Sequence, residues 1–78
     1  PAAIIGASPG TLGTARAQYH LRQVGVFLDL HFLNKPEVMI GSAAERFDTD
    51  GKLKDEKTAE HIRKLMDSLH RWTAKLTA

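Results

Sequence analysis

The chain has 78 residues, with 11 Lys or Arg against nine Asp or Glu, so its formal net charge is +2. The cations are scattered and have no aromatic residues interleaved, so nucleic acid is not an expected partner. The chain has no cysteine, which excludes disulfides, thiolate metal ligands and cysteine nucleophiles, and we expect a cytoplasmic location. No stretch approaches the roughly 20 apolar residues of a membrane span, so no membrane association is expected.

Residues 2–7 are an apolar run that predicts a strand buried inside a parallel sheet. Such a strand needs neighbours on both edges, and we therefore expect the chain to be part of a longer protein. Residues 8–13 follow as a loop of small residues that leads into a helix. Free backbone N–H groups at such a junction suit an electron-rich ligand, and Gly10 and Gly13 would let it approach closely. Ordinary turns between a strand and a helix have similar glycines, so the loop alone leaves both interpretations open.

Residues 14–30 predict a helix, with Thr11 or Thr14 as its N-cap. Gly25 in mid-helix costs up to about 1 kcal/mol relative to alanine, so we expect it to mark a close contact with another helix or subunit. The stripe expected to pack on the sheet has helical spacing and consists of Ala17, Leu21, Val24 and Leu28.

Residues 31–40 predict a second strand, interrupted by Asn34-Lys35-Pro36 and therefore placed at a sheet edge. A polar loop follows and ends in a turn at residues 48–51. Asp55 then caps a helix predicted over residues 56–76. Its stripe is more consistent with packing on the sheet than with a partner-binding face, and consists of Ala59, Ile62, Leu65 or Met66, Leu69, Trp72 and Leu76.

No metal site is expected. The four histidines, His20, His31, His61 and His70, match no spacing typical of zinc ligands. The turn at residues 48–51 has the composition of a calcium loop, but Arg46 and Lys57 occupy the positions where such a loop needs carboxylates.

The chain carries a family resemblance that runs from about Pro1 to the final helix and is densest from Ser8 to Glu37. It joins the loop GASPGTLGT (6–14) to ARAQYHLRQ (15–23), VFLD (26–29) and LNKPE (33–37). This string resembles the C-terminal half of the NAD(P)H-dependent FMN reductases, which include quinone, azo-dye and chromate reductases. The resemblance implies an α/β fold in which residues 1–78 form a single segment, the C-terminal βαβα part of a flavodoxin-like, three-layer, doubly wound parallel sheet. The missing half would hold three strands and the phosphate-binding loop.

The resemblance also implies an enzyme that transfers hydride from NADPH or NADH through FMN to a small-molecule acceptor: a quinone, an azo compound, chromate or free flavin. Ser8 matches a serine that contacts the flavin, and Pro9, Gly10, Thr11 and Gly13 would act through their backbone. No catalytic acid or base is required, because the cofactor performs the redox chemistry. The alternative is a non-catalytic oligomerisation or interaction fragment without the phosphate-binding half.

A second group of residues is expected at a subunit interface. Arg16 and Tyr19 lie three residues apart and share a helix face, and Glu37 comes from the interrupted edge strand. In the resembling reductases these positions form a hydrogen-bonded network between subunits, which implies a homo-oligomer, a dimer or a tetramer. The alternative is that these residues are solvated surface groups.

Overall fold

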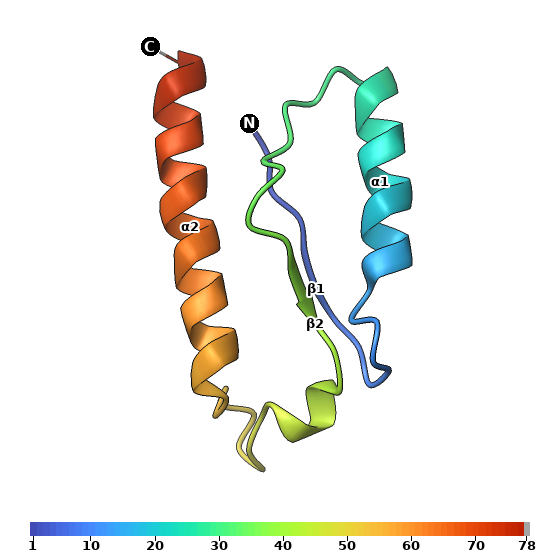
Figure 1. Ribbon diagram of the computed structural model, residues 1–78, viewed down its shortest axis with the longest axis vertical. Helices are drawn as coiled ribbons and strands as arrows, with labels where there is room; N and C mark the ends of the chain where they lie inside the picture. The colour runs from blue at the N-terminus through green and yellow to red at the C-terminus, as the bar shows by residue number, and fades with distance from the viewer. Residues whose placement is uncertain (78) are drawn as a thin grey trace.

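The computed structural model describes residues 1–77 and places two parallel strands between two helices (Figure 1). Both strands run toward the same end of the molecule, and both helices begin at that end. The elements in chain order are β1 (Ile5–Ala7), α1 (Ala15–Phe27), β2 (Val38–Ile40), the short 3-10 helix η1 (Ala43–Glu45) and α2 (Glu56–Thr77).

The parallel pairing of the two predicted strands is confirmed. Ile5 lies opposite Val38, and an isolated parallel bridge joins Ala2 to Phe32 further back along the same two segments. Regular pairing stops between these two points, where Pro36 has no N–H to donate. The regular strands are therefore shorter than the predicted segments 2–7 and 31–40. The second edge of β1 has no neighbour within residues 1–77.

The hydrophobic core lies between β2 and α2. Val38, Ile40 and Leu65 are only 2%, 8% and 3% exposed, and Ile62 and Leu33 pack against them. Most of the predicted stripe of the second helix therefore faces the sheet, with Leu65 rather than the exposed Met66 at its centre, whereas Leu76 at its end is exposed. The indole N–H of Trp72 donates a hydrogen bond to the His31 carbonyl oxygen at 3.1 Å, so α2 is also joined to the chain ahead of β2.

The predicted packing face of α1 is only partly right. Ala17 and Leu21 line a hollow beside Ile5 of β1. Leu21, Val24 and Leu28 are nevertheless 46%, 53% and 59% exposed, and the buried residues of the helix are Gln18 and Gly25. Gln18 and Gly25 are also separated by two helical turns, and each follows directly after a residue of the predicted apolar stripe. Long-range contacts of Gln18 and Gly25 orient this second face toward the sheet.

The close contact expected at Gly25 exists, but its partner is Phe32 of the same chain. A Cβ added at Gly25 would stand 2.8 Å from Cδ2 of the Phe32 ring and nearer still to Cε2. The expected partner, another helix or subunit, is therefore wrong. The helix also ends at Phe27 rather than at residue 30, and Asp29 adopts a left-handed conformation with φ of 57°.

The two predicted helix caps have different outcomes. Asp55 caps α2 as expected, because its Oδ2 accepts hydrogen bonds from the Thr58 hydroxyl and from the Thr58 N–H at 3.1 Å. These bonds, led by the hydroxyl, hold the pKa of the Asp55 carboxyl below its usual value, with a further contribution from Arg46. Thr14 occupies the N-cap position of α1, but its side chain makes no capping hydrogen bond.

The turn predicted at residues 48–51 is confirmed. The Asp48 carboxylate accepts hydrogen bonds from the N–H groups of Asp50 and Lys52, each at 2.9 Å. Gly51 supplies the left-handed conformation, with φ of 81°. Residues 1–77 include no group of three or more His, Asp or Glu side chains placed to hold a metal ion.

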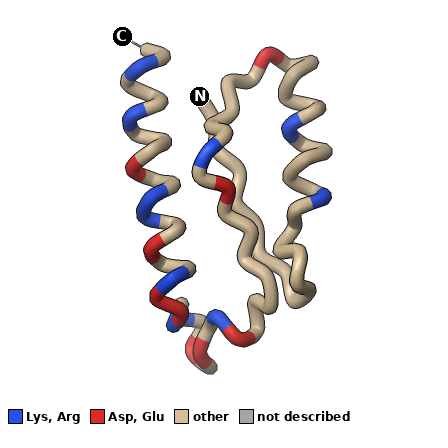
Figure 2. Tube along the Cα trace, viewed as in Figure 1, with Lys and Arg blue, Asp and Glu red and all other residues tan. Residues whose placement is uncertain are grey.

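Charge is distributed unevenly over the layers (Figure 2). Lys, Arg, Asp and Glu alternate along α2, whereas residues 1–15 carry no charged side chain and α1 carries only Arg16 and Arg22. Neither helix, over the part of the chain described, is long and apolar enough to cross a membrane.

Candidate functional site

The predicted ligand loop, residues 8–13, lies at the carboxyl ends of both strands (Figure 1). The Ser8 N–H donates to the Ile40 carbonyl oxygen at 2.9 Å, and the Ala43 N–H donates to the Ser8 carbonyl oxygen at the same distance. The Ser42 N–H donates to the Gly10 carbonyl oxygen at 2.8 Å. The loop after β1 is therefore fastened to the chain that leaves β2, and its start is fixed in position.

Three consecutive amides of this loop are free. Within residues 1–77, the N–H groups of Gly10, Thr11 and Leu12 donate no hydrogen bond. All three residues are exposed. Buried or ligand-facing backbone donors need acceptors, so this row of amides can bind a polar ligand edge laid across the loop.

The two glycines of the loop differ in their surroundings. A Cβ added at Gly10 would meet nothing nearer than the Ser8 Oγ at 4.0 Å, so the space above Gly10 is open. Gly13 is buried with φ of 56°, and an added Cβ would stand 2.7 Å from the Gly41 nitrogen. Gly10 is therefore the glycine that a ligand can approach, and Gly13 lets the loop pack against the end of β2.

Ser8 and Pro9 begin the loop. The Ser8 hydroxyl donates only a long hydrogen bond, 3.5 Å, to the Gly10 carbonyl oxygen, so it can reorient toward a ligand. Pro9 has no N–H and is exposed. Its contribution is to the path of the backbone ahead of the three free amides.

The second predicted group is partly assembled within one chain. Tyr19 on α1 and Glu37 ahead of β2 lie near each other, and the Glu37 carboxylate raises the pKa of the Tyr19 phenol. Arg16 is exposed, and its side chain makes no ion pair or hydrogen bond within the part of the chain described. The structure therefore brings together two of the three residues.

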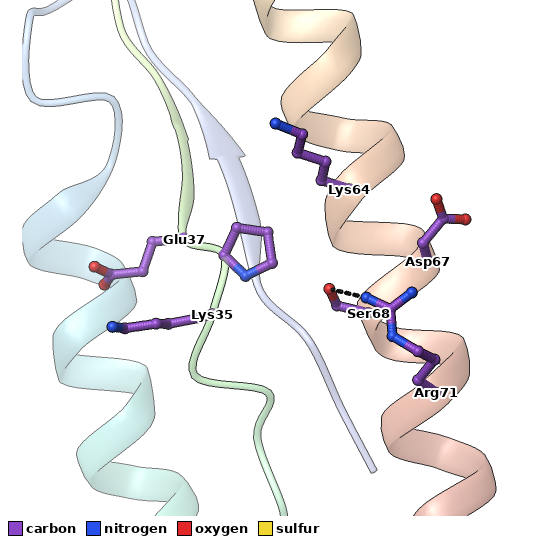
Figure 3. Close-up of a pocket in the computed structure, with 7 residues that line it drawn as sticks. Lys35, Glu37, Lys64, Asp67, Ser68 and Arg71 are labelled. Carbon is purple, nitrogen blue, oxygen red and sulfur yellow. Dashed lines mark hydrogen bonds between the residues drawn. The ribbon is translucent and has the colours of Figure 1, made fainter.

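A shallow groove of about 690 Å³ lies elsewhere, at the amino end of β2 (Figure 3). Lys35 and Glu37 extend from one side of it toward α1, and Arg71 on the α2 side donates a hydrogen bond to Ser68 at 3.2 Å. Its lining charges are mixed, and it lies at the opposite end of β2 from the loop at 8–13. We therefore assign the groove no part in the candidate site. Its lining residues are Lys35, Pro36, Glu37, Lys64, Asp67, Ser68 and Arg71.

Sequence reasoning missed Gln18 and predicted Thr14 only as a helix cap, although both residues shape the loop. Thr14 closes the loop in a left-handed conformation, with φ of 74°. Gln18 is buried beneath it and donates a hydrogen bond to the Thr14 hydroxyl. Their spacing of four residues places them on one helix face, and this was the only signal in the sequence.

Comparison with known proteins decides the family. The family model for NADPH-dependent FMN reductase matches residues 1–45. The chain belongs to this family. The match covers β1, the loop at 8–13, α1 and β2, so it includes the candidate site of this FMN reductase family member.

Individual relatives agree with this assignment. The chain is 59% identical over 76 residues to an NAD(P)H-dependent FMN reductase of Pseudomonas aeruginosa, which covers 97% of the chain and 41% of the relative. It is 49% identical over 78 residues to an NADPH:quinone oxidoreductase of Arabidopsis thaliana, with 97% and 39% covered. It is 42% identical over 72 residues to a 2-hydroxy-1,4-benzoquinone reductase of a Burkholderia species, with 92% and 39% covered. The chain thus spans about 40% of the length of these relatives.

The loop fits part of the cofactor that the family name implies. The flat ring of FMN is edged by carbonyl oxygens and nitrogens that accept hydrogen bonds. The free amides of residues 10–12 and the open space above Gly10 match such an edge. Residues 1–15 offer no cationic side chain for the phosphate, so the fit is to the ring.

Proposed function

We propose that the complete protein carrying this chain is an FMN-dependent oxidoreductase that transfers hydride from NADPH or NADH to a quinone. The observation that carries this proposal is the row of three free, exposed amides at Gly10, Thr11 and Leu12, set at the carboxyl ends of two parallel strands. Ligands of open α/β sheets bind at this edge. The relatives, two of them named quinone reductases, support the same reaction class.

The residues of this chain orient the flavin and stabilise charge. FMN, when bound, supplies the hydride chemistry, and no acid or base of this chain is needed. The amides of residues 10–12 donate to the carbonyl edge of the ring, where negative charge grows on reduction. Donors fixed in advance toward developing charge are an effective source of such stabilisation. The hydrogen bonds that fasten Ser8 and Gly10 to the end of β2 supply this rigidity.

We further propose that this chain is the C-terminal βαβα part of a flavodoxin-like domain, doubly wound in three layers. The helices on both faces of the parallel pair support this arrangement. The unpaired edge of β1 is where the strands of the remaining part would join. The phosphate-binding loop would then come from that part.

Quinones are the first proposed acceptors because the names of two relatives contain a quinone as the substrate. Azo compounds, chromate and free flavin are further candidates, since a site that exposes a flat ring admits many flat or oxidising molecules. The alternative role as a non-catalytic interaction fragment is not favoured, because the family match includes the loop at 8–13.

The test uses the complete protein. We expect the purified protein to be yellow, with flavin absorbance near one FMN per chain, and to oxidise NADPH or NADH when benzoquinone is added. Acid extraction and chromatography identify the flavin. A complete protein that retains no FMN after reconstitution, or that holds FMN but does not oxidise either nicotinamide, contradicts the proposal.

We also propose a homo-oligomer, a dimer or a tetramer, whose interface uses α1 with Arg16, Tyr19 and Glu37. The exposed apolar residues of α1 and the exposed Arg16 beside Tyr19 support an interface on this helix. Closed two-fold contacts are the commonest among soluble oligomers, so each residue would contribute twice.

A further inference from the structure

Gln18 is the most buried polar residue of α1, with 3% of its surface exposed. Its Nε2 donates hydrogen bonds to the Val38 carbonyl oxygen on β2 at 2.9 Å and to the Thr14 hydroxyl oxygen at 3.0 Å. Exchanging the amide oxygen and nitrogen would set Oε1 against the Val38 carbonyl oxygen, two acceptors facing each other. The orientation of the amide is therefore fixed, and both protons of Nε2 are used.

The other end of the Gln18 amide has no partner. Oε1 is buried and accepts no hydrogen bond within residues 1–77. A buried acceptor without a donor costs stability, and the two hydrogen bonds made by Nε2 offset that cost. These two bonds are the feature to explain.

Thr14 is the residue that Gln18 holds. Thr14 has φ of 74° and ψ of 18°, a left-handed conformation that β-branched residues rarely adopt. Its side chain also lies against Gly6 of β1, because a Cβ added at Gly6 would overlap the Thr14 hydroxyl. Strained backbone of this kind persists only where the surroundings impose it, and Gln18 and Gly6 are those surroundings.

Thr14 sets the far end of the loop that carries the free amides. Gly13 and Thr14 are both left-handed, so the chain reverses its curvature between Leu12 and the first turn of α1. The near end of the loop is held separately, by the bonds of Ser8 and Gly10 to the chain after β2. Between these two fixed ends lie residues 10–12.

We propose that Gln18 is a positioning residue for the flavin: through Thr14 it fixes the direction of the amides of residues 10–12. This inference rests on the proposed function, because it gives those amides a flavin to meet. Gln18 itself does not touch the ring. Its substitution loosens the loop, so the amides no longer point together at the edge where charge develops.

The test compares Gln18→Met with Gln23→Met in the complete protein. Methionine has a similar length, no charge and no donor, and Gln23 is an exposed residue of the same helix, so the pair matches the chemical change. Gln18→Met is expected to weaken FMN binding about tenfold. This is the change in affinity that follows when misoriented amides lose the free energy of roughly one hydrogen bond to the flavin. Gln18→Met is also expected to make the flavin reduction potential more negative, whereas Gln23→Met leaves both quantities at wild-type values.

A second pair tests the link through Thr14. Thr14→Ser keeps the hydroxyl that Gln18 holds, and Thr14→Val keeps the branched shape without it. Thr14→Ser is expected to retain the wild-type potential and FMN affinity, and Thr14→Val to shift both as Gln18→Met does. The potential is the decisive readout, because a purely structural loss lowers FMN content without changing the potential of the flavin that remains bound.

The outcomes separate this inference from the proposed function. Wild-type complete protein that binds no FMN overturns the proposed function and this inference with it. Wild-type protein that binds FMN, with Gln18→Met indistinguishable from Gln23→Met, overturns this inference alone. If Gln18→Met does not fold, the threonine pair decides: equal potentials in Thr14→Ser and Thr14→Val overturn the inference.

Discussion

Gly25 of α1 lies directly against the ring of Phe32, closely enough that a Cβ at Gly25 would overlap ring carbons. The contact joins the end of α1 to the chain that leads into β2, beside the bridge between Ala2 and Phe32. Arg22 adds to the same place, with its guanidinium 5.8 Å from the centre of the Phe32 ring and a hydrogen bond to the Leu33 carbonyl oxygen. The helix is thereby held to the sheet at this end without an apolar stripe.

Gly25→Ala is therefore expected to destabilise the protein, although alanine favours a helix by up to about 1 kcal/mol. Crowding against a packed ring costs about 1–3 kcal/mol, which outweighs that gain. Urea unfolding of the complete protein measures the change. Phe32→Leu in the same chain makes room for the added methyl group, so the double variant should lose less than the sum of the two single variants. Additive losses would contradict the contact.

Gly10→Val is expected to remove most of the bound FMN without unfolding the protein. The space above Gly10 is open, so a side chain there meets no protein atoms and instead occupies the place of the ring. Ser8→Ala is the milder companion and should weaken FMN binding by about 1 kcal/mol, one hydrogen bond. Flavin absorbance per chain and equilibrium titration measure both. Unchanged flavin content in Gly10→Val would show that the loop is not the site.

Glu37→Gln is expected to lower the pKa of the Tyr19 phenol toward its ordinary value, because the carboxylate that favours the protonated phenol is gone. A phenol whose pKa is raised in the folded state stabilises the fold fully below the unfolded pKa, and this contribution is lost as the pH rises through the folded pKa. The loss of this stabilisation therefore occurs in alkaline solution, above about pH 10. Ultraviolet titration, taken as the difference from Tyr19→Phe, isolates this tyrosine. Identical titrations with and without the carboxylate would contradict the pairing.

The proposed assembly has a separate test. Tyr19→Ala and Glu37→Lys are expected to shift the sedimentation profile of the complete protein toward smaller species while the circular dichroism spectrum stays unchanged. Glu60→Lys serves as the matched charge reversal, at an exposed carboxylate of α2, and should sediment as the wild type does. Wild-type protein that sediments as a monomer at micromolar concentration would rule the assembly out.

Asp55→Ala is expected to lower the thermal unfolding midpoint at neutral pH, since the carboxylate caps α2 through Thr58. The folded pKa of Asp55 is lowered, so its contribution is present above the unfolded pKa of about 4 and is lost as the pH falls through the folded value. The wild-type and variant midpoints should therefore converge in acid, below about pH 4. Asp67→Ala removes an exposed carboxylate of the same helix that caps nothing and is the control at neutral pH, where its loss should be smaller than that of Asp55→Ala.

The sequence was a better guide to α2 than to α1, for a physical reason. In α2 one apolar stripe at helical spacing meets an apolar strand, and burial decides the orientation. In α1 two faces have helical spacing, and hydrophobicity predicts the apolar one as the inner face. The orientation depends instead on where Gln18 meets Val38 and where Gly25 meets Phe32. Helical spacing places Gln18 and Gly25 on one face, but it does not reveal that Val38 and Phe32 are their partners.

In the candidate site, too, local features could be predicted from the sequence, and features that depend on distant contacts could not. The position of the loop at 8–13 could be predicted, because small residues between a strand and a helix are a local pattern. The roles of its two glycines could not, since Gly13 differs from Gly10 through its left-handed conformation and through the approach of Gly41 from another part of the chain. Gln18 was missed because its importance depends on the conformation of Thr14, which sequence does not reveal for a threonine.

The inner face of α1 fixes the orientation of the helix, and its exposed side is free of that constraint. Its rotation about its own axis is fixed on the inner face by a glutamine amide and by a glycine beneath a ring. The side of the helix that carries Val26 and Phe27, 81% and 86% exposed, can therefore change in size and hydrophobicity without turning the helix or disturbing the loop at its start.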